Sequence, residues 1–477
     1  MIPIKGRVPT RLAVANAVGS IAYGVKDNGF STFLLLFYNQ VLGMEARLVS
    51  FALLVALVFD GFLDPVIGHL SDSTRTRWGR RLPWLYLAGV PLGVAWYVLW
   101  TPSGTPSFLV LVASAVIVRG LVACVEVPSN ALVPEITRDY DERTRLVRYR
   151  YLFGWAGGLL MLMLAYQVFL PADMLGTTGY RNFGLTGAIL ITGTVLLSAL
   201  FQHRYVAVPP PPRAAGEHKR LGSAFSDIRE CVTHPAFVVL LVAIALGYIS
   251  QGITFSISNY LYLYVWRFSP LAFQLYPWLL FASVVGAFLF VGPLQRRWGK
   301  RGVAIGSGLV GMALWVLPLT LRNYVIPPGS GVAGATLALL FAFILASNMA
   351  SVIAMISISS MVPDVVEASE EQTGRRSEGT FTAGGLFASK CATGIGIFAT
   401  GLILEYAGMP GKATPGSVAP QIIDRLTMTY AVILLVLAIV QATVLRRFPI
   451  SRDDHIARLA ALDAAARADP DATGAHP

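Results

Sequence analysis

The sequence predicts an all-α integral membrane protein with twelve transmembrane helices arranged in two bundles of six. The 477 residues are 55% hydrophobic and 13% charged, with a mean hydropathy of +0.63, whereas a soluble domain carries about 25% charged residues. Apolar blocks of about twenty or more residues, the length that crosses a bilayer, recur along the chain. Only three cysteines are present, too few for a disulfide framework. These observations exclude a soluble enzyme, a disordered chain and a secreted disulfide-rich protein.

Each predicted span is an apolar block that ends at polar or charged residues. In chain order the spans cover residues 12–42, 46–70, 83–102, 106–133, 149–171, 182–204, 236–266, 270–294, 302–322, 330–362, 377–407 and 420–446. The widest break follows the sixth span and contains four consecutive prolines, Pro209–Pro212. We therefore expect an N-terminal bundle over 1–204, a cytosolic linker over 205–235, a C-terminal bundle over 236–447 and a cytosolic tail over 448–477.

The basic residues indicate how the chain is oriented in the membrane. With both termini in the cytosol, 28 of the 37 Lys and Arg residues lie on the cytosolic side, six on the other side and three within spans. Such an excess marks the cytosolic loops of membrane proteins. The net charge of +11 is explained by topology and does not require a nucleic-acid partner. We expect a multi-pass monomer in the lipid bilayer of the inner or plasma membrane.

A short motif occurs once in each half. It reads Arg77-Trp78-Gly79-Arg80-Arg81 after the second span and Arg297-Trp298-Gly299-Lys300-Arg301 after the eighth, at an offset of 220 residues. The matched positions indicate duplication of a six-span unit, as in major facilitator transporters. We predict that the charged residues of these two loops hold the cytosolic side closed: Asp72, Arg77, Arg80, Arg81, Arg297, Lys300 and Arg301.

Seven ionisable residues fall within the predicted spans. They are Lys26, Asp27, Asp60, Asp64, Arg119, Glu126 and Lys390. An ionisable group in a span costs several kcal/mol unless it is paired or faces water, so each one is a candidate for function. All four acids lie in the first half, and Lys390 is the one base of this set in the second half.

Asp60 and Asp64 are four residues apart, so their carboxylates share one face of a helix. Two carboxylates so close repel each other unless a cation lies between them. The pair could take up a proton, or could bind Na⁺ if further oxygens complete its coordination. The structural alternative is that Asp60 pairs with a neighbouring base while Asp64 caps a bend at Pro65.

The other intramembrane charges give further hypotheses. Arg119 and Glu126 are seven residues apart on one face, so Glu126 is either a third cation ligand or the partner of Arg119. Asp27 could accept hydrogen bonds from substrate hydroxyls, while Lys26 reaches sideways to another acid. Lys390, among small residues that let helices approach closely, should counterbalance the acids of the first half or contact the substrate.

Enzymatic chemistry is disfavoured. The sequence has no GxxxxGK[ST] loop for ATP and no HExxH or CxxC motif. We expect no cofactor and no metal, except for H⁺ or Na⁺ as a coupling ion at Asp60 and Asp64.

Four segments together resemble the glycoside–pentoside–hexuronide:cation symporters, the melibiose-permease branch of the major facilitator superfamily. They are FDGFLDPVIGHLSDSTRTRWGRRLPW (59–84), YGVKDNG (23–29), EVPSNALVPEITRDYDERTRL (126–146) and MVPDVVEASEEQTGRRSEGTF (361–381). The resemblance covers nearly the whole chain. It implies a symporter in which two bundles alternately expose a central site.

The resemblance also implies roles for matching residues. Asp60 and Asp64 match the paired cation-binding aspartates, Glu126 matches an acid that assists them, and Lys390 matches a lysine beside them. Asp27 matches the acceptor of sugar hydroxyls, with Lys26 next to it. The candidate substrate-binding set is Asp27, Lys26, Arg119, Asn130, Arg150 and Tyr151.

Several positions depart from the melibiose permeases. Leu63 stands in place of an Asn and Ala123 in place of a Thr, which removes oxygen ligands that Na⁺ needs, so we favour H⁺ coupling. Asn130 replaces a sugar-stacking Trp, and Tyr151 replaces a substrate-binding Arg, although Arg150 is adjacent. The cargo is therefore a sugar or glycoside, or alternatively a lysolipid or other amphiphile. A membrane sensor that transports nothing is a third reading.

Overall fold

The computed structural model describes residue 4 and residues 6–104, 106–171, 173–207, 235–325, 331–365 and 378–448. This part of the chain is helical apart from turns, loops and two isolated β-bridges, which confirms the predicted all-α class. Most of the predicted linker, all but the first residue of the predicted tail and the middle of the 361–381 motif lie outside the described residues.

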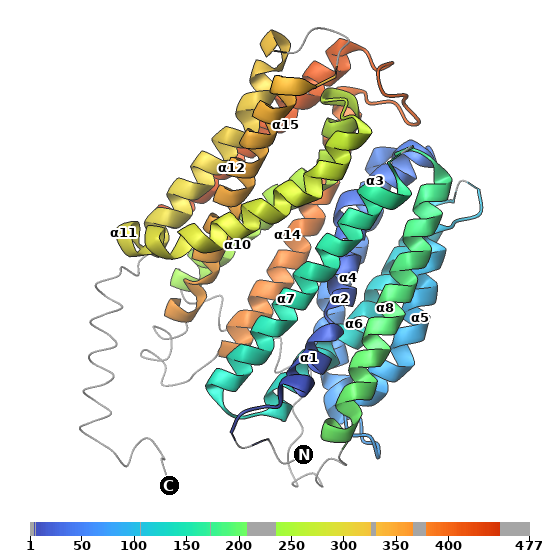
Figure 1. Cartoon of the computed structure of the whole chain (residues 1–477), viewed down its shortest axis with the longest axis vertical. Helices are drawn as coiled ribbons and strands as arrows, with labels where there is room; N and C mark the ends of the chain where they lie inside the picture. The colour runs from blue at the N-terminus through green and yellow to red at the C-terminus, as the bar shows by residue number, and fades with distance from the viewer. Residues whose placement is uncertain are drawn as a thin grey trace.

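The first half contains helices that follow one another up and down the molecule (Figure 1). They are α1 (Thr10–Val18), α2 (Ile21–Asn28), η1 (Gly29–Phe33), α3 (Leu34–Leu36), η2 (Phe37–Val41), α4 (Ala46–Ser73), α5 (Leu82–Trp100), α6 (Phe108–Ile136), α7 (Tyr140–Leu164), η3 (Ala165–Phe169) and α8 (Thr177–Val206). The second half contains α10 (Pro235–Tyr260), η4 (Leu261–Val265), α11 (Pro270–Val325), α12 (Gly334–Ser359), α14 (Glu378–Ala407) and α15 (Pro420–Arg446). The η segments are single π-helical turns, which interrupt α-helices frequently at functional sites.

Ten helices among the described residues are long and apolar enough to cross a membrane, against twelve predicted spans. Two local features account for the difference. The predicted first span, 12–42, is divided into short helical pieces from α1 to η2. The eighth and ninth spans form one element, α11, of 56 residues, and a straight helix of that length would extend about 80 Å. Its backbone is non-helical at Gly299, so α11 contains two spans.

The repeated motif has a structural reason in its glycine. Gly79 has a φ of 91° and Gly299 a φ of 70°, values that favour glycine. In both copies the arginine before the tryptophan lies over the indole ring, Arg77 at 5.4 Å and Arg297 at 5.3 Å from the ring centroid. The first copy lies in the loop between α4 and α5 and the second at the kink of α11, so the two share the positive φ and the arginine–tryptophan contact but not the whole turn. We call the side of the molecule that carries these turns the RWG face.

The two halves meet through α4, α10 and α14. Helix α14 packs against α4 of the first half and α10 of its own half, and α10 also contacts η1 and α3. Figure 1 shows the ribbons of α10 and α7 close together near α3 and spreading apart toward the lower left. The face where they converge, opposite to the RWG face, we call the sealed face.

Hydrogen bonds join the halves at the sealed face. The Gln40 amide of η2 donates to the Pro410 carbonyl at 3.0 Å, and its oxygen accepts from the Tyr264 hydroxyl at 3.0 Å and the Ala413 amide at 2.9 Å. Nearby, Asn259 of α10 donates to the Thr32 carbonyl at 2.8 Å. Each of these bonds joins residues from opposite halves of the sequence, so this seal depends on how the two bundles are packed.

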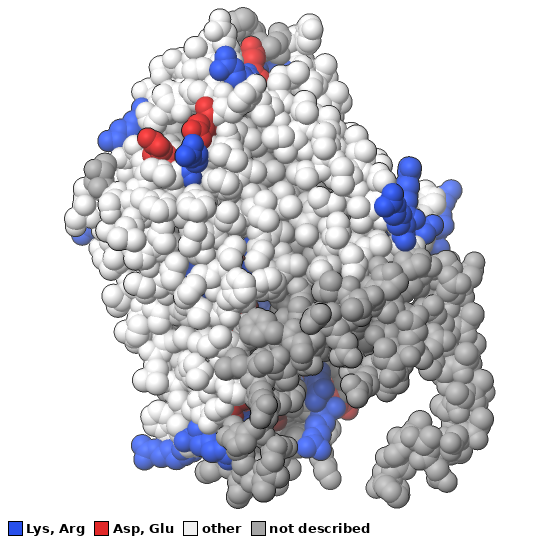
Figure 2. Space-filling view, turned by 180° about the vertical axis from the view of Figure 1, so that it is seen from behind, with Lys and Arg blue, Asp and Glu red and all other residues white. Residues whose placement is uncertain are grey.

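The outer surface is that of a membrane protein. Large apolar side chains are exposed on the outer helices, for example Leu87 at 76%, Leu109 at 73% and Leu289 at 68%. Figure 2 shows charged side chains gathered toward the edges of one face, while the broad area between them carries almost none. Exposed apolar side chains in such a band suit contact with lipid.

Glycines place α2 directly against α7. A Cβ built on Gly24 would lie 1.9 Å from the carbonyl oxygen of Gly154 and 2.5 Å from the amide of Gly158, so a larger residue does not fit. Helix α7 begins at Tyr140, nine residues before the predicted span, because the Asp139 carboxylate accepts from the Glu142 amide and caps the helix. This close crossing fixes the position of α2, which carries Lys26 and Asp27.

Candidate cation and substrate site

A lysine from the second half lies between the two aspartates of α4. The Lys390 ammonium of α14 donates to Asp64 Oδ2 at 2.6 Å and lies 3.2 Å from Asp60 Oδ1. The Asp60 side chain is fully buried, and those of Lys390 and Asp64 are 17% and 27% exposed. Both Asp60 Oδ1 and Asp64 Oδ1 lack a well-aligned hydrogen bond. The acid pair and the second half are thus joined by one ammonium group.

Arg119 of α6 contacts Asp60 from the other side. Its Nη1 lies 3.4 Å from Asp60 Oδ2, and its guanidinium lies 4.3 Å from the ring centroid of Phe30. Only 4% of the Arg119 side chain is exposed, and its Nε has no hydrogen-bond partner. A cation over an aromatic face gains electrostatic energy, which holds the guanidinium in this position.

Lys26 connects the remaining two acids. Its ammonium lies 2.9 Å from Asp27 Oδ1 and 3.6 Å from Glu126 Oε2. Lys26 is 5% exposed, Glu126 27% and Asp27 63%. One of the two roles predicted for Glu126, that of partner to Arg119, is wrong. Arg119 approaches α4 and pairs with Asp60, whereas Glu126 approaches α2 and pairs with Lys26.

All seven predicted intramembrane charges therefore lie in two adjoining groups. They come from α2, α4, α6 and α14. Within this set four acids face three bases. The buried guanidinium of Arg150, which has neutral hydrogen-bond partners, also acts electrostatically on Glu126 and balances the fourth acid.

The predicted substrate residues separate into exposed and buried members. Tyr151 is 69% exposed, and Asp27 is the most exposed of the acids. Arg150, in contrast, is buried at 7% and its Nη1 lies within hydrogen-bond distance of Asn16 Oδ1 at 3.2 Å and Ser129 Oγ at 2.9 Å. Its Nη2 donates to Asn130 Oδ1 at 2.6 Å, so the buried Arg150 is bound to Asn130, an exposed member of the set. In this conformation Arg150 holds α1, α6 and α7 together.

Sequence reasoning missed residues of the second half that face the site. Tyr248 of α10 lies near Asp27 and Tyr151 of the first half, and no charge in its segment marks it. The Asn39-Gln40 pair at the sealed face was also missed, although two amides in an apolar span are a signal that sequence alone provides. Ionisable residues by themselves do not reveal these neutral partners.

The predicted gating residues pair within their own halves. Arg81 bonds to Asp72, and Arg80 and Arg81 lie 2.9 and 3.2 Å from Glu135. In the second half, Lys300 lies 2.7 Å from Asp364, and Arg301 donates to the Phe448 carbonyl at 3.0 Å. Arg77 and Arg297 lie over Trp78 and Trp298. These contacts do not bridge the halves, so a closing role at the RWG face stays a prediction for another conformation.

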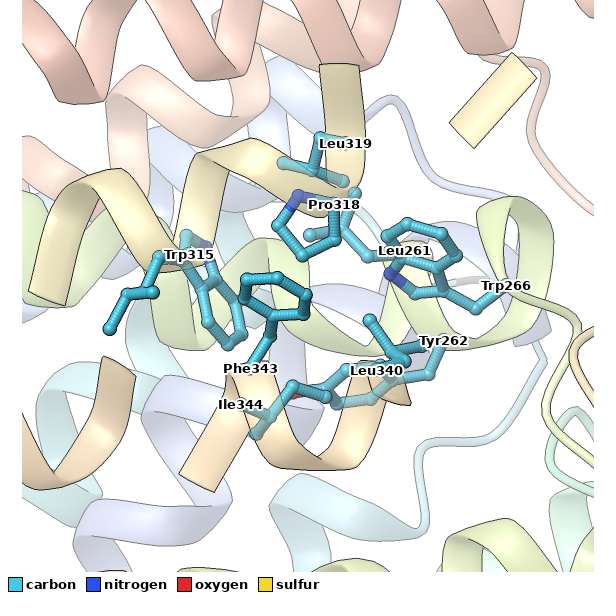
Figure 3. A pocket seen from close by; sticks show the side chains of 10 residues that line it. Leu261, Tyr262, Trp266, Trp315, Pro318, Leu319, Leu340, Phe343 and Ile344 are labelled. Atoms are coloured by element: carbon cyan, nitrogen blue, oxygen red, sulfur yellow. The ribbon is translucent and has the colours of Figure 1, made fainter. Parts of the chain in front are cut away.

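A cavity in the second half does not fit a polar substrate. Figure 3 shows it between η4, α11 and α12, lined by Trp315, Phe343 and other apolar side chains, with no acid or base. It has no charged side chain, and the Tyr262 hydroxyl and the Trp315 indole already donate to Tyr276 and Tyr430. The acids and exposed tyrosine between the halves remain the better candidate site.

Comparison with known proteins identifies the family of the chain. The profile of the family described as MFS/sugar transport protein matches residues 15–452. An uncharacterized symporter of Synechocystis sp. is 29% identical, over 83% of this chain and 87% of its own. A putative glycoside/cation symporter of Escherichia coli is 25% identical over 90% of each chain.

Solved structures show the same fold. The xylose transporter XylE from E. coli, in a partially occluded inward-open conformation, superposes with a TM-score of 0.59 at 14% identity, over 93% of this chain and 99% of that one. The nucleoside transporter NupG superposes with a TM-score of 0.58 at 15% identity, over 92% of this chain and 97% of that one.

Proposed function

Because the chain belongs to the family of MFS/sugar transport proteins, we propose that it is a symporter that couples the movement of a cation to that of a sugar or glycoside. One observation carries the proposal: the acid pair of the first half is joined to the second half by Lys390. A cation that binds there competes with Lys390 for the same oxygens. Binding of the cation therefore weakens the Lys390 contact between the two bundles and changes the equilibrium between conformations, as coupling requires.

The orientation follows from charge. The RWG face carries most of the basic loops, so we assign it to the cytosol. The seal around Gln40 then lies on the outer side, and the described conformation faces inward. Alternating access requires that the bundles rock about the central site, so that this seal opens while the RWG face closes.

H⁺ remains our preferred coupling ion. Leu63 and Ala123 supply no oxygen to the acid pair, and two bases already contact its carboxylates. A proton needs one carboxylate oxygen, whereas Na⁺ needs several ligands at once.

The substrate would bind between Asp27 and Tyr151 of the first half and Tyr248 of the second. Exposed carboxylate and aromatic groups suit a sugar, since the acid accepts from hydroxyls and the ring packs on the apolar face. The names of similar proteins, among them an isoprimeverose transporter and a putative sulfoquinovose importer, favour sugars as cargo. An amphiphile remains the alternative cargo.

The test is uptake into proteoliposomes. Radiolabelled monosaccharides, glycosides and lysolipids are offered under an imposed pH gradient, or under a Na⁺ gradient at constant pH. We expect glycoside or sugar uptake that follows the pH gradient and is lost in Asp60→Asn. Glu405→Gln, an acid in an exposed ion pair with Arg47, is the matched control. Lysolipid uptake would replace the sugar proposal, and unchanged function of Asp60→Asn would favour the sensor.

A further inference from the structure

Two bases approach Asp60, but they differ in how they are held. Lys390 belongs to α14 of the second half, so its contact with Asp60 changes whenever the bundles move against each other. Arg119 belongs to α6 of the same half as Asp60 and is almost fully buried. It stays beside Asp60 in every conformation that preserves the first bundle.

The Arg119 guanidinium is fixed by more than its ion pair. Phe30 of η1, itself fully buried, covers the guanidinium at 4.3 Å. The side chain therefore cannot swing away without exposing a charge to the apolar interior, which is costly. Its positive charge lies next to an aspartate that a coupling Na⁺ would have to use.

We propose that Arg119 is the residue that keeps Na⁺ out of the acid pair. The guanidinium supplies permanently the charge that a bound Na⁺ would bring, and a second fixed cation at that distance is strongly repelled. Unlike Na⁺, a proton joins a carboxylate oxygen covalently and needs no open coordination sphere. This inference rests on the proposed cation coupling, and it assigns the choice of ion to a residue that is not one of the acids.

Replacement of the charge should open the site. In Arg119→Gln, the buried Asp60 would lose its partner within the first half and an amide oxygen would stand where the guanidinium was. Asp64 Oδ1, which accepts no hydrogen bond, and Asp60 Oδ1, which would keep only its ion pair with Lys390, would then be available as ligands. We expect the affinity for Na⁺ to rise on the order of 100-fold.

Equilibrium binding of radioactive Na⁺ to purified protein tests this without knowledge of the substrate. We expect no saturable binding to the wild type, clear saturation in Arg119→Gln, and none in Arg119→Lys, which keeps the charge. The double variant Arg119→Gln/Asp60→Asn should lose the gain, because the carboxylate is gone. Thermal unfolding of each variant confirms that it is folded.

Two results would overturn the proposal. Saturable Na⁺ binding to the wild type would overturn it. This measurement needs no variant, so it decides the question even if Arg119→Gln does not fold. A folded Arg119→Gln protein that binds no Na⁺ would overturn it as well. Neither result depends on uptake, so a failure here is distinct from a failure of the symport assay.

Discussion

Lys390 and Asp64 are 326 residues apart in sequence, yet the ammonium lies 2.6 Å from the carboxylate. The contact crosses from α14 to α4, which makes it part of the interface that must change during transport. It links a partly exposed carboxylate of one bundle to the position of the other.

Loss of this ammonium should uncouple transport. Lys390→Met leaves Asp64 without its base and Asp60 with Arg119 alone, so repulsion between the carboxylates grows. We expect gradient-driven uptake to fall at least about tenfold. The free energy of unfolding should fall by about 3 kcal/mol. Proteoliposome uptake and thermal unfolding measure the two effects. The control is Arg425→Gln on α15, an exposed base; an equal loss there would contradict a specific role.

Gln40 should control the seal. Gln40→Leu removes its bonds to Tyr264, Pro410 and Ala413, each worth about 1 kcal/mol. We expect the equilibrium to shift by at least about tenfold toward a conformation that is open at the sealed face. The measurement is the rate at which a membrane-impermeant maleimide, applied from that side, labels Thr32→Cys in a background free of native cysteines.

The matched control for the seal is Gln202→Leu. Gln202 is also a buried glutamine, but its bonds to Asn16 and Ser198 stay within the first half. Its loss should lower stability without a change in labelling. Equal labelling rates in the two variants would show that the seal does not depend on Gln40.

Arg150 and Tyr151 are adjacent in sequence, but their substitution should affect different properties: stability for Arg150 and substrate affinity for Tyr151. Arg150→Met removes a buried guanidinium that satisfies Asn16, Ser129 and Asn130, so unfolding should become easier by about 3 kcal/mol. Tyr151→Ala removes an exposed ring, so stability should hold while the KM for uptake rises about tenfold. Unfolding curves and uptake kinetics of both variants separate the roles. A Tyr151→Ala protein with an unchanged KM would remove this residue from the substrate site.

Gly299 should be needed for the turn within α11. Its φ of 70° and ψ of 162° lie in a region that other residues rarely adopt, so Gly299→Ala should cost about 2 kcal/mol. Gly292→Ala, in the same element with ordinary helical φ and nothing near its Cβ position, is the control and should be close to neutral. Thermal unfolding of the two variants in one detergent compares them directly.

The sequence allowed the spans and the seven charges to be recognised, because both depend on local signals. Apolar length predicts a span, and four-residue spacing places Asp60 and Asp64 on one face. The partner of Arg119 could not be found in this way. Its spacing to Glu126 fixes a shared face, but the neighbouring helix decides which acid lies there.

The breaks in the first span and the seal were also beyond local reasoning. The π-helical turns η1 and η2 lie in an apolar stretch whose composition predicts a continuous helix, and η1 and α3 pack against α10 of the other half. The role of Gln40 depends on carbonyl and amide groups of residues about 370 positions away. The sequence around Gln40 does not predict those partners.

The close crossing of α2 and α7 has a consequence for how cargo travels. Gly24, Gly154 and Gly158 leave no side chain between the two helices, so they move as one rigid unit. Asp27 and Tyr151 therefore keep their spacing throughout the cycle. A molecule that binds both residues should therefore move with the first bundle. Tyr248 belongs to the other bundle, so its distance from Asp27 and Tyr151 changes as the bundles rock. Substitutions at Tyr248 should therefore weaken cargo binding more in one conformation than in the other.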